Sequence, residues 1–369
     1  METDRDRAVG ALIEEAIGDA VCEDIESGEP VGSTEVNLRA LRQIATGDCA
    51  KFERCLKGWP AFEKAVKGDE PHWFKDLLSL WRPSGQSSGA AGLRVAIRNG
   101  YLNFYRFGQS IARVEYVSGD LIADVHYKYV LDERPPGMSP KSPYLRLTPK
   151  GVSFRGALVA PYEGLSTLHR WIAVAEKEHA GAEKSIVDEL VAENDHVIDL
   201  EMALPAWARS KAAVRMDLVA IENGTVVFWE AKTILNSEIR CMAELEEDKT
   251  PHVLEQLSHY RVFLEQDSHV EQVQLAYRNT AKLLVKLRAL ADENKIGPAL
   301  KLGKSIEEAA GQPDRLAVAP LAALVVVDLP ADNKRAWKTW KASHEGKLKG
   351  KIPMRVLESP GPLLYAGAQ

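Results

Sequence analysis

The spacing of hydrophobic residues divides the 369-residue chain into three parts. Between residues 5 and 82 apolar residues recur at helical spacing, and the Ser- and Gly-rich residues 84–92 then predict a flexible break. Between residues 93 and 130 four short apolar runs alternate with turn signals, a pattern typical of an antiparallel meander. The turn signals are Asn99-Gly100, Gly108-Gln109 and Ser118-Gly119.

The C-terminal part alternates between helix-like and strand-like periods. A proline-rich segment at residues 133–143 marks the margin of the meander, and residues 144–160 are again strand-like. The elements that follow are predicted as a helix over 168–194, a strand over 196–204, a hairpin over 215–232, helices over 251–265 and 270–292, and a buried strand over 321–329. The order is therefore α-β-β-β-α-β with a helical insertion before the last strand, which predicts an α/β fold, and we expect domain limits of 1–83, 93–160 and 165–369.

The hairpin carries the first chemical signal. Asn223-Gly224 lies between two apolar runs and favours a two-residue turn, which places Asp217 opposite Glu230. Facing side chains on such strands have Cβ atoms about 4.5 to 5.5 Å apart, so two carboxylates there repel each other. A divalent cation would remove the repulsion. The alternative is an exposed, charged strand end without a metal.

Cations and further polar groups lie near this acidic pair. The same register places Lys232 opposite Arg215. Glu183 lies on the inward stripe of its predicted helix, where it either joins a metal site or simply interacts with the helix dipole, and Glu201 on the next strand is its substitute. Gln256 and Tyr260 are four residues apart, so they share one helix face and could address one phosphate.

The order of these residues resembles the PD-(D/E)XK nuclease superfamily, and its RecB-like branch most closely. The resemblance covers roughly the C-terminal half of the chain and is carried by Glu183, Asp217, Glu230-Ala231-Lys232 and Gln256-x-x-x-Tyr260. Met216 replaces the proline for which the superfamily is named, whereas Arg215 gives the Arg-x-Asp form of RecB-like proteins. The resemblance implies a restriction-endonuclease-like α/β core with a mixed central sheet, and cleavage of DNA with Mg²⁺ or Mn²⁺.

The resemblance also assigns roles to individual residues. Asp217, Glu230 and the Ala231 carbonyl would bind metal with help from Glu183. Lys232 would activate water and steady the phosphate charge. Gln256 and Tyr260 would orient the substrate. The four cysteines, Cys22, Cys49, Cys55 and Cys241, lack the grouping of iron–sulfur members, so no iron–sulfur cluster is expected.

The overall composition does not indicate a nucleic-acid partner. The formal net charge is -6 and the sequence pI is about 5.9, so contacts with DNA must come from a local patch. Residues 334–355 provide one, with eight Lys or Arg residues against one Glu, and Arg215, Trp337, Lys338 and Trp340 are the candidate substrate contacts. The alternative is an amphipathic helix whose tryptophans pack inward.

Other expectations concern location and rival functions. The charged N-terminus and the short apolar runs predict neither a signal peptide nor a membrane span, so a cytoplasmic location is expected. The Gly-rich phosphate loop, the Gly-x-Ser-x-Gly elbow and the His-Glu-x-x-His motif are all lacking in the sequence, which argues against those hydrolase families.

The sequence therefore predicts a metal-dependent DNA nuclease with a role in defence or repair. DNA, single- or double-stranded, is its expected partner, and a homodimer or an accessory protein is compatible with it. The alternative is a catalytically silent, nuclease-like module that binds DNA or protein. The N-terminal half either recognises a target or packs against the rest.

Overall fold

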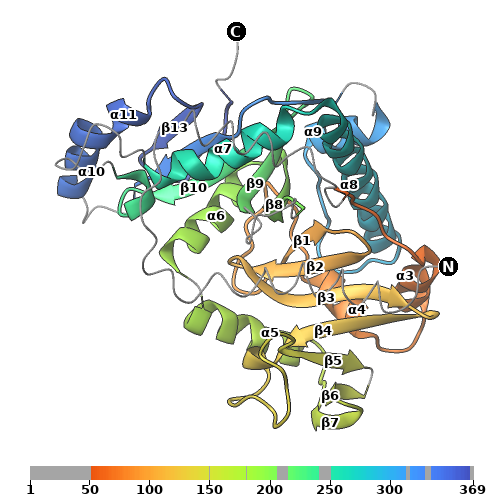
Figure 1. Cartoon of the computed structure of the whole chain (residues 1–369). Helices are drawn as coiled ribbons and strands as arrows, with labels where there is room; N and C mark the ends of the chain where they lie inside the picture. Colours follow the sequence, from red (N-terminus) through yellow and green to blue (C-terminus); the bar gives the residue numbers. More distant parts are fainter. Residues whose placement is uncertain are drawn as a thin grey trace.

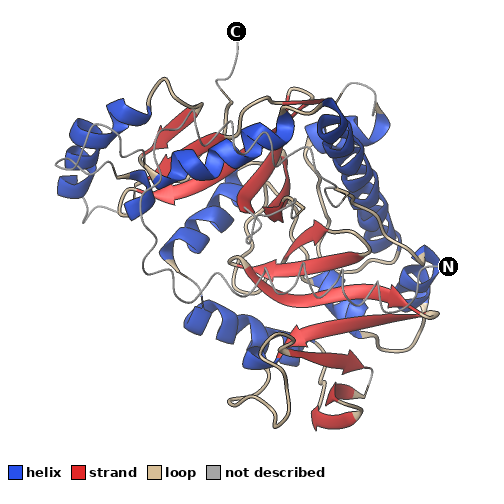
Figure 2. Cartoon of the chain, viewed as in Figure 1, coloured by secondary structure: helices blue, strands red, loops and turns tan. Residues whose placement is uncertain are grey.

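The computed structural model describes residues 51–148, 150–179, 181–205, 215–240, 251–312, 316–328 and 334–365. In this part of the chain the protein is a mixed α/β fold built on two sheets (Figures 1 and 2). The predicted helices before residue 51 lie outside the described residues, as do three of the four cysteines. The described remainder of the N-terminal helical region forms α3 (Trp59–Lys67) and α4 (Trp73–Ser79).

The first sheet is an antiparallel meander whose seven strands follow chain order. Its strands are β1 (Arg94–Ile97), β2 (Tyr101–Arg106), β3 (Gln109–Val117), β4 (Asp120–His126), β5 (Tyr144–Thr148), β6 (Gly151–Phe154) and β7 (Ala157–Ala160), with the short turn η1 (Tyr127–Tyr129) after β4. The three predicted turns are confirmed, and Gly100, Gly108 and Gly119 adopt the positive φ angles that such turns require. The strand-like residues after the proline-rich segment extend the same sheet.

The second sheet has six strands and is mixed. Three of its strands follow a first group of helices, two follow a second group, and the sixth strand comes later in the chain. The elements up to the fifth strand are α5 (Leu165–Val174), the π-helical η2 (Ala175–His179), α6 (Ala182–Glu193), β8 (Val197–Ala203), β9 (Arg215–Glu222), β10 (Thr225–Thr233), η3 (Ser237–Ile239), α7 (His252–Leu264), α8 (Asp267–Glu293), α9 (Lys304–Gly311), β11 (Ala317–Val318) and β12 (Ala323–Val327). β8, β9 and β10 pair antiparallel, while β12 pairs parallel to β10. The predicted order α-β-β-β-α-β and the mixed sheet are confirmed.

One predicted helix is divided in the structure, and one strand was not predicted. The helix expected over 168–194 is divided into α5 and α6, because Gly181 caps α6 with an extended backbone that interrupts the helical run. After α10 (Lys334–Trp340), η6 (Lys341–Glu345) and α11 (Gly346–Leu348), the chain adds β13 (Met354–Leu357), which pairs parallel to β12. The many Lys and Arg residues just before β13 do not form the apolar pattern that predicts a buried strand.

Alternating side chains of β10 bury the two faces of the second sheet under different helices. Val227 and Trp229 join the core cluster that contains Ile186 of α6. Val226 and Phe228 join the cluster that contains residues of α7 and α8. The hairpin that starts from Asn223-Gly224 is thus the centre of a three-layer arrangement, with α6 on one face and α7 and α8 on the other.

The two sheets share a hydrophobic core and buried ion pairs. One cluster of buried residues includes members of β2, β9, α7 and α8. Arg98, which follows β1, lies 2.5 Å from Asp199 of β8, and Arg94 of β1 lies 2.9 Å from Asp188 of α6. The domain limits near residue 160 stay a prediction, but the described residues on either side pack together.

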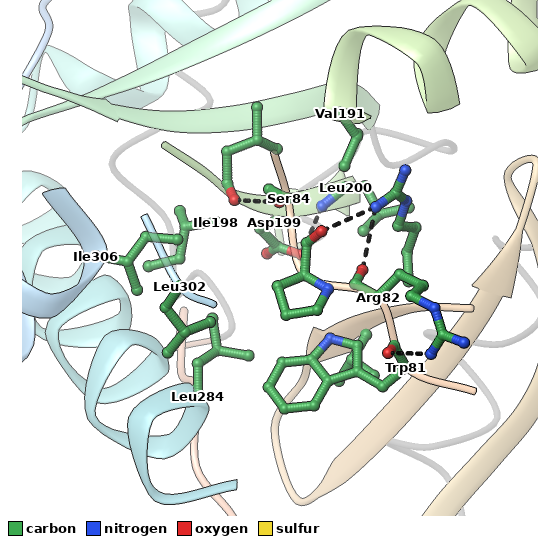
Figure 3. A pocket seen from close by; sticks show the side chains of 14 residues that line it. Trp81, Arg82, Ser84, Val191, Ile198, Asp199, Leu200, Leu284, Leu302 and Ile306 are labelled. Carbon is green, nitrogen blue, oxygen red and sulfur yellow. Dashed lines mark hydrogen bonds between the residues drawn. The ribbon is translucent and has the colours of Figure 1, made fainter. Parts of the chain in front are cut away.

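A small pocket lies at this junction, between the first sheet, β8, α8 and α9 (Figure 3). Its volume of about 20 Å³ is enough for about one water molecule. Mostly apolar side chains line it, including Trp81, Leu284 and Ile306, together with Asp199. The pocket therefore does not fit a substrate, and the candidate site lies elsewhere, at the end of β10.

The described helices do not meet the requirements for crossing a bilayer. Even the longest of them, α8, has polar residues along its length, and none in the described part of the chain has the length and apolar run of a membrane span.

Candidate functional site

The hairpin register places the acidic residues at the end of a strand pair. Asn223 and Gly224 form the turn with positive φ angles of 50° and 79°. From there β9 and β10 pair up to Leu218 and Trp229, as predicted. Beyond this ladder the two strands are joined by a side-chain contact, in which Asp217 Oδ2 accepts a hydrogen bond from the Ala231 N–H at 2.8 Å. The predicted turn and register are confirmed as far as Leu218 and Trp229, while the expected pairs Asp217–Glu230 and Arg215–Lys232 lie beyond the described ladder. Asp217 lies beside the Glu230-Ala231 segment through its side chain.

Lys232 is the centre of an acidic cluster. Its Nζ lies 2.8 Å from Glu230 Oε1, 2.7 Å from Glu238 Oε2 and 3.8 Å from Glu183 Oε1. The Lys232 side chain is only 8% exposed, so these ion pairs are largely shielded from water. Glu183 of α6 therefore converges on the hairpin, as the sequence suggested.

Gln256 reaches the same cluster from α7. Its Nε2 donates to Glu230 Oε1 at 2.8 Å and to the Arg215 carbonyl at 3.2 Å. Gln256 thus fixes one oxygen of the Glu230 carboxylate and ties α7 to the start of β9. Arg215 itself pairs with Ala203 of β8 in the described ladder.

Tyr260 does not share this position, and the expectation that it addresses one phosphate together with Gln256 is not met. Its side chain is fully buried, and its hydroxyl donates to the Met202 carbonyl at 3.3 Å. The ring packs beside Phe228, with ring centroids 5.8 Å apart. Because α7 is buried on several sides, the residue one turn beyond Gln256 enters the core instead of the site.

Burial and repulsion act on the charges of the site. Burial, followed by repulsion from Glu230 and Glu201, raises the pKa of Asp217 well above its ordinary value. Burial raises the pKa of Glu230 to about 7, although Lys232 and Gln256 stabilise its charge. Burial disfavours the Lys232 ammonium, but attraction to the surrounding carboxylates outweighs it and raises the Lys232 pKa. The described geometry therefore keeps a positive charge among crowded acids.

The structure adds two residues, Asn236 and Glu238, that the sequence argument missed. Asn236 begins the turn after β10: its Oδ1 accepts from the Glu238 N–H and its Nδ2 donates to Glu183 Oε2, both at 2.8 Å. This turn carries Glu238 to Lys232. Its Asn-Ser-Glu sequence is a capping signal that could have predicted the turn, but not the contact.

Glu201, named from sequence as the substitute for Glu183, lies on β8 within electrostatic reach of Asp217. Its backbone has a positive φ of 49°, which is uncommon for a residue other than glycine and is often found at functional sites. Its Oε1 lies 3.4 Å from Lys184 Nζ, and its charge helps to raise the Asp217 pKa. Both Glu183 and Glu201 therefore flank the central pair from neighbouring elements.

The oxygen atoms at the end of the strand pair are the candidate donors to a metal ion. Glu230 Oε2 is buried and has no hydrogen-bond partner, so one carboxylate oxygen is left to bind a cation beside Asp217. The Ala231 carbonyl is the third expected donor at this strand end. As the side chains stand, no group of three or more His, Cys, Asp or Glu residues within the described ranges is arranged as a metal site. Lys232 occupies the space among the glutamates instead.

The basic C-terminal segment lies against the same turn. Trp340 of α10 is 2% exposed, and its Nε1 donates to the Ile239 carbonyl at 3.3 Å, next to Glu238. It packs inward and is not available to stack on a base, so that expectation is corrected. Trp337 is half-buried, and Lys341 lies 4.5 Å from its ring centroid. Lys338 is exposed and remains a candidate contact with a phosphate.

The chain was also compared with known proteins. A scan against protein-family models, a search of curated proteins and a search of solved structures all gave no match.

Proposed function

We propose that this protein is a divalent-metal-dependent nuclease that hydrolyses DNA phosphodiester bonds. The observation that carries the proposal is that Asp217, Glu230 and Lys232 lie together at the end of one strand pair, where desolvation and repulsion from Glu230 raise the pKa of Asp217. Like charges at a strand end repel each other, and a bound cation would relieve the repulsion between these carboxylates. The fold order and the residue order of the resemblance support the same proposal.

The residues divide the work between metal and substrate. Asp217 and Glu230 would hold the cation with the Ala231 carbonyl, and Glu183 would assist. A bound Mg²⁺ or Mn²⁺ polarises the phosphoryl oxygen and lowers the pKa of a bound water. Gln256 holds Glu230 Oε1 in place, and Glu230 Oε2, which has no hydrogen-bond partner, would be the oxygen that binds the cation.

Lys232 supplies the positive charge that faces the phosphate. It already lies 2.8 Å from Glu230, so a phosphate bound beside the metal ligands is within its reach. The exposed Lys338 on α10 and the other basic residues of that segment would contact phosphates further along the strand.

A catalytically silent, nuclease-like binding module is the second candidate. The pairing of Lys232 with three carboxylates favours it, because a lysine held this way resembles a structural ion-pair cluster. The two candidates differ in one outcome, which is whether phosphodiester bonds are cut.

The test is a cleavage assay with single- and double-stranded DNA and with RNA. Each substrate is incubated with Mg²⁺, with Mn²⁺ or with EDTA, for the wild-type protein and for Asp217→Asn, Lys232→Ala and the control Glu189→Gln on the exposed face of α6. We expect DNA cleavage that requires metal and is lost in the first two variants only. Cleavage in EDTA, or cleavage retained by both site variants, would reject the mechanism, and no cleavage of any substrate would favour the binding module.

A further inference from the structure

The turn η3 is built to hold Glu238 at the candidate site. Asn236 caps the turn at its start through the Glu238 N–H. The carbonyl of Ile239 at its end accepts from Trp340 Nε1, and Ile239 is fully buried. The backbone is thus held in place on both sides of Glu238. The position of the Glu238 carboxylate beside Lys232 therefore depends on the backbone conformation as well as on the attraction between the charges.

Three carboxylates compete for the three N–H donors of Lys232. Glu230 and Glu238 are the close partners, at 2.8 and 2.7 Å, while Glu183 lies at 3.8 Å. The Glu230 side chain is 3% exposed and is also held by Gln256, whereas that of Glu238 is 35% exposed. A phosphate that approaches Lys232 from solvent therefore meets Glu238 as the close partner that can be displaced.

A place for the displaced carboxylate is also present. Glu238 Oε1 lies 3.5 Å from His252 Nδ1, and the His252 side chain is 64% exposed. His252 is the first residue of α7, and a helix N-terminus favours a nearby carboxylate. Glu238 can thus leave Lys232 without being left in an apolar environment.

We propose that Glu238 is a positioning residue that occupies Lys232 in the absence of substrate and gives way to the phosphate. This inference rests on the proposed nuclease function and adds a residue that sets how tightly substrate binds. The two anions compete for one cation, so removing the Glu238 charge strengthens phosphate binding at Lys232. The buried Glu230 contact is unchanged and keeps the ammonium near the cation ligands.

The kinetic test compares Glu238→Gln with Glu238→Asp and with the control Glu189→Gln. A partly exposed ion pair contributes about 0.2 to 1 kcal/mol, so we expect KM for an oligonucleotide to fall by a factor of about 1.4 to 5 in Glu238→Gln. We expect kcat to change less than KM, Glu238→Asp to lie nearer the wild type, and the control to match it. An unchanged KM, or a loss of kcat as large as in Lys232→Ala at wild-type stability, would overturn the proposal.

A second readout does not depend on cleavage. The wild-type protein and the same variants are treated briefly with acetic anhydride in EDTA, and acetylation of Lys232 is measured by peptide mass spectrometry. Loss of the Glu238 charge makes the ammonium easier to deprotonate and more open to solvent, so acetylation should rise at least about twofold in Glu238→Gln only. Equal acetylation in all proteins would refute the pairing. If the wild type cuts no nucleic acid, the proposed function fails, while this readout still decides whether Glu238 holds Lys232.

Discussion

Gln256 Nε2 lies 2.8 Å from Glu230 Oε1, which joins helix α7 to strand β10 across the candidate site. The same nitrogen lies 3.2 Å from the Arg215 carbonyl, so one amide connects the helix to both strands of the hairpin. The contact fixes the Glu230 oxygen that Lys232 also binds. Gln256 is therefore placed to orient the Glu230 carboxylate, the proposed metal ligand, whereas Tyr260, one turn later, is placed to support the core.

The first prediction separates these two roles. In Gln256→Leu the Glu230 carboxylate loses a donor, and we expect cleavage to fall about tenfold or more, because metal ligands depend on their supporting hydrogen bonds. Tyr260→Phe removes the bond to the Met202 carbonyl, which lies in the core, so cleavage should stay within about twofold while stability falls by about 1 kcal/mol. Cleavage rates and urea unfolding measure both effects.

The opposite pattern would restore a direct role for Tyr260. If Tyr260→Phe lost cleavage at unchanged stability, its hydroxyl would have to reach substrate after a rearrangement of α7. If Gln256→Leu cut DNA as well as the wild type, Glu230 would not need its orienting partner.

The second prediction concerns pH and the stability of the metal-free protein. The pKa of Glu230 is about 7 in the folded protein, against an ordinary value of 4.5. The folded state therefore binds its proton more tightly than the unfolded state does. The carboxyl imposes no penalty below pH 4.5, and the penalty grows as pH rises through 7. This group alone should remove up to about 3 kcal/mol of stability between those limits.

Urea unfolding in EDTA at pH 5 and pH 8 measures this loss. Glu230→Gln, which cannot ionise, should lose less stability than the wild type over the same range. Added Mg²⁺ should stabilise the wild type more at pH 8 than at pH 5, because protons and metal compete for the same oxygens. A variant with the same pH dependence as the wild type would show that Glu230 is not the group responsible.

Local patterns in the sequence were sufficient for much of the fold. The meander and the hairpin were predicted because Asn-Gly and related dipeptides fix turn geometry within a few residues. The register of a two-residue turn then placed Asp217 opposite Glu230, and in the structure the Asp217 carboxylate lies beside that segment, bonded to the Ala231 N–H. These features depend on neighbours in sequence, which is why periodicity and turn chemistry could find them.

Features that depend on distant contacts could not be predicted in the same way. Helical spacing places Gln256 and Tyr260 on one face, but it does not show how deeply each is buried. In the structure Gln256 is half-buried at the site, whereas Tyr260 is buried in the core. The pairing of Glu238 with Lys232 requires the turn of the chain after β10, and the inward packing of Trp340 requires a partner carbonyl about a hundred residues away, at Ile239.

The third prediction concerns the basic segment. Lys338 is exposed on α10, so Lys338→Ala should weaken binding to all DNA sequences and reduce the slope of log K against log salt by about 0.7 to 0.9. Trp340→Ala should instead destabilise the fold by about 3 to 5 kcal/mol, since it empties a buried site. Fluorescence anisotropy over a range of salt concentrations, with urea unfolding beside it, measures the two effects. An unchanged salt slope in Lys338→Ala would place the DNA on another surface.

The last prediction concerns the junction of the two sheets. Asp199 of β8 is fully buried and lies 2.5 Å from Arg98 Nη1, while its other oxygen accepts from the Tyr277 hydroxyl of α8 at 3.2 Å. Asp199→Asn leaves the Arg98 charge buried without its counter-ion, so we expect a loss of about 3 to 5 kcal/mol. Because the sheets share one core, both should unfold in a single transition at a lower urea concentration.

Asp124→Asn is the matched control within the first sheet. Asp124 pairs with Arg146 at 2.8 Å, but the Arg146 side chain is 45% exposed, so this change should cost less than about 1 kcal/mol. Circular dichroism and tryptophan fluorescence followed through the same urea titration measure both variants. Two separate transitions in Asp199→Asn would show that the sheets fold independently and that the ion pair only holds them together. A single shifted transition would show that the first sheet supports the β-strands on which Asp217 and Lys232 stand.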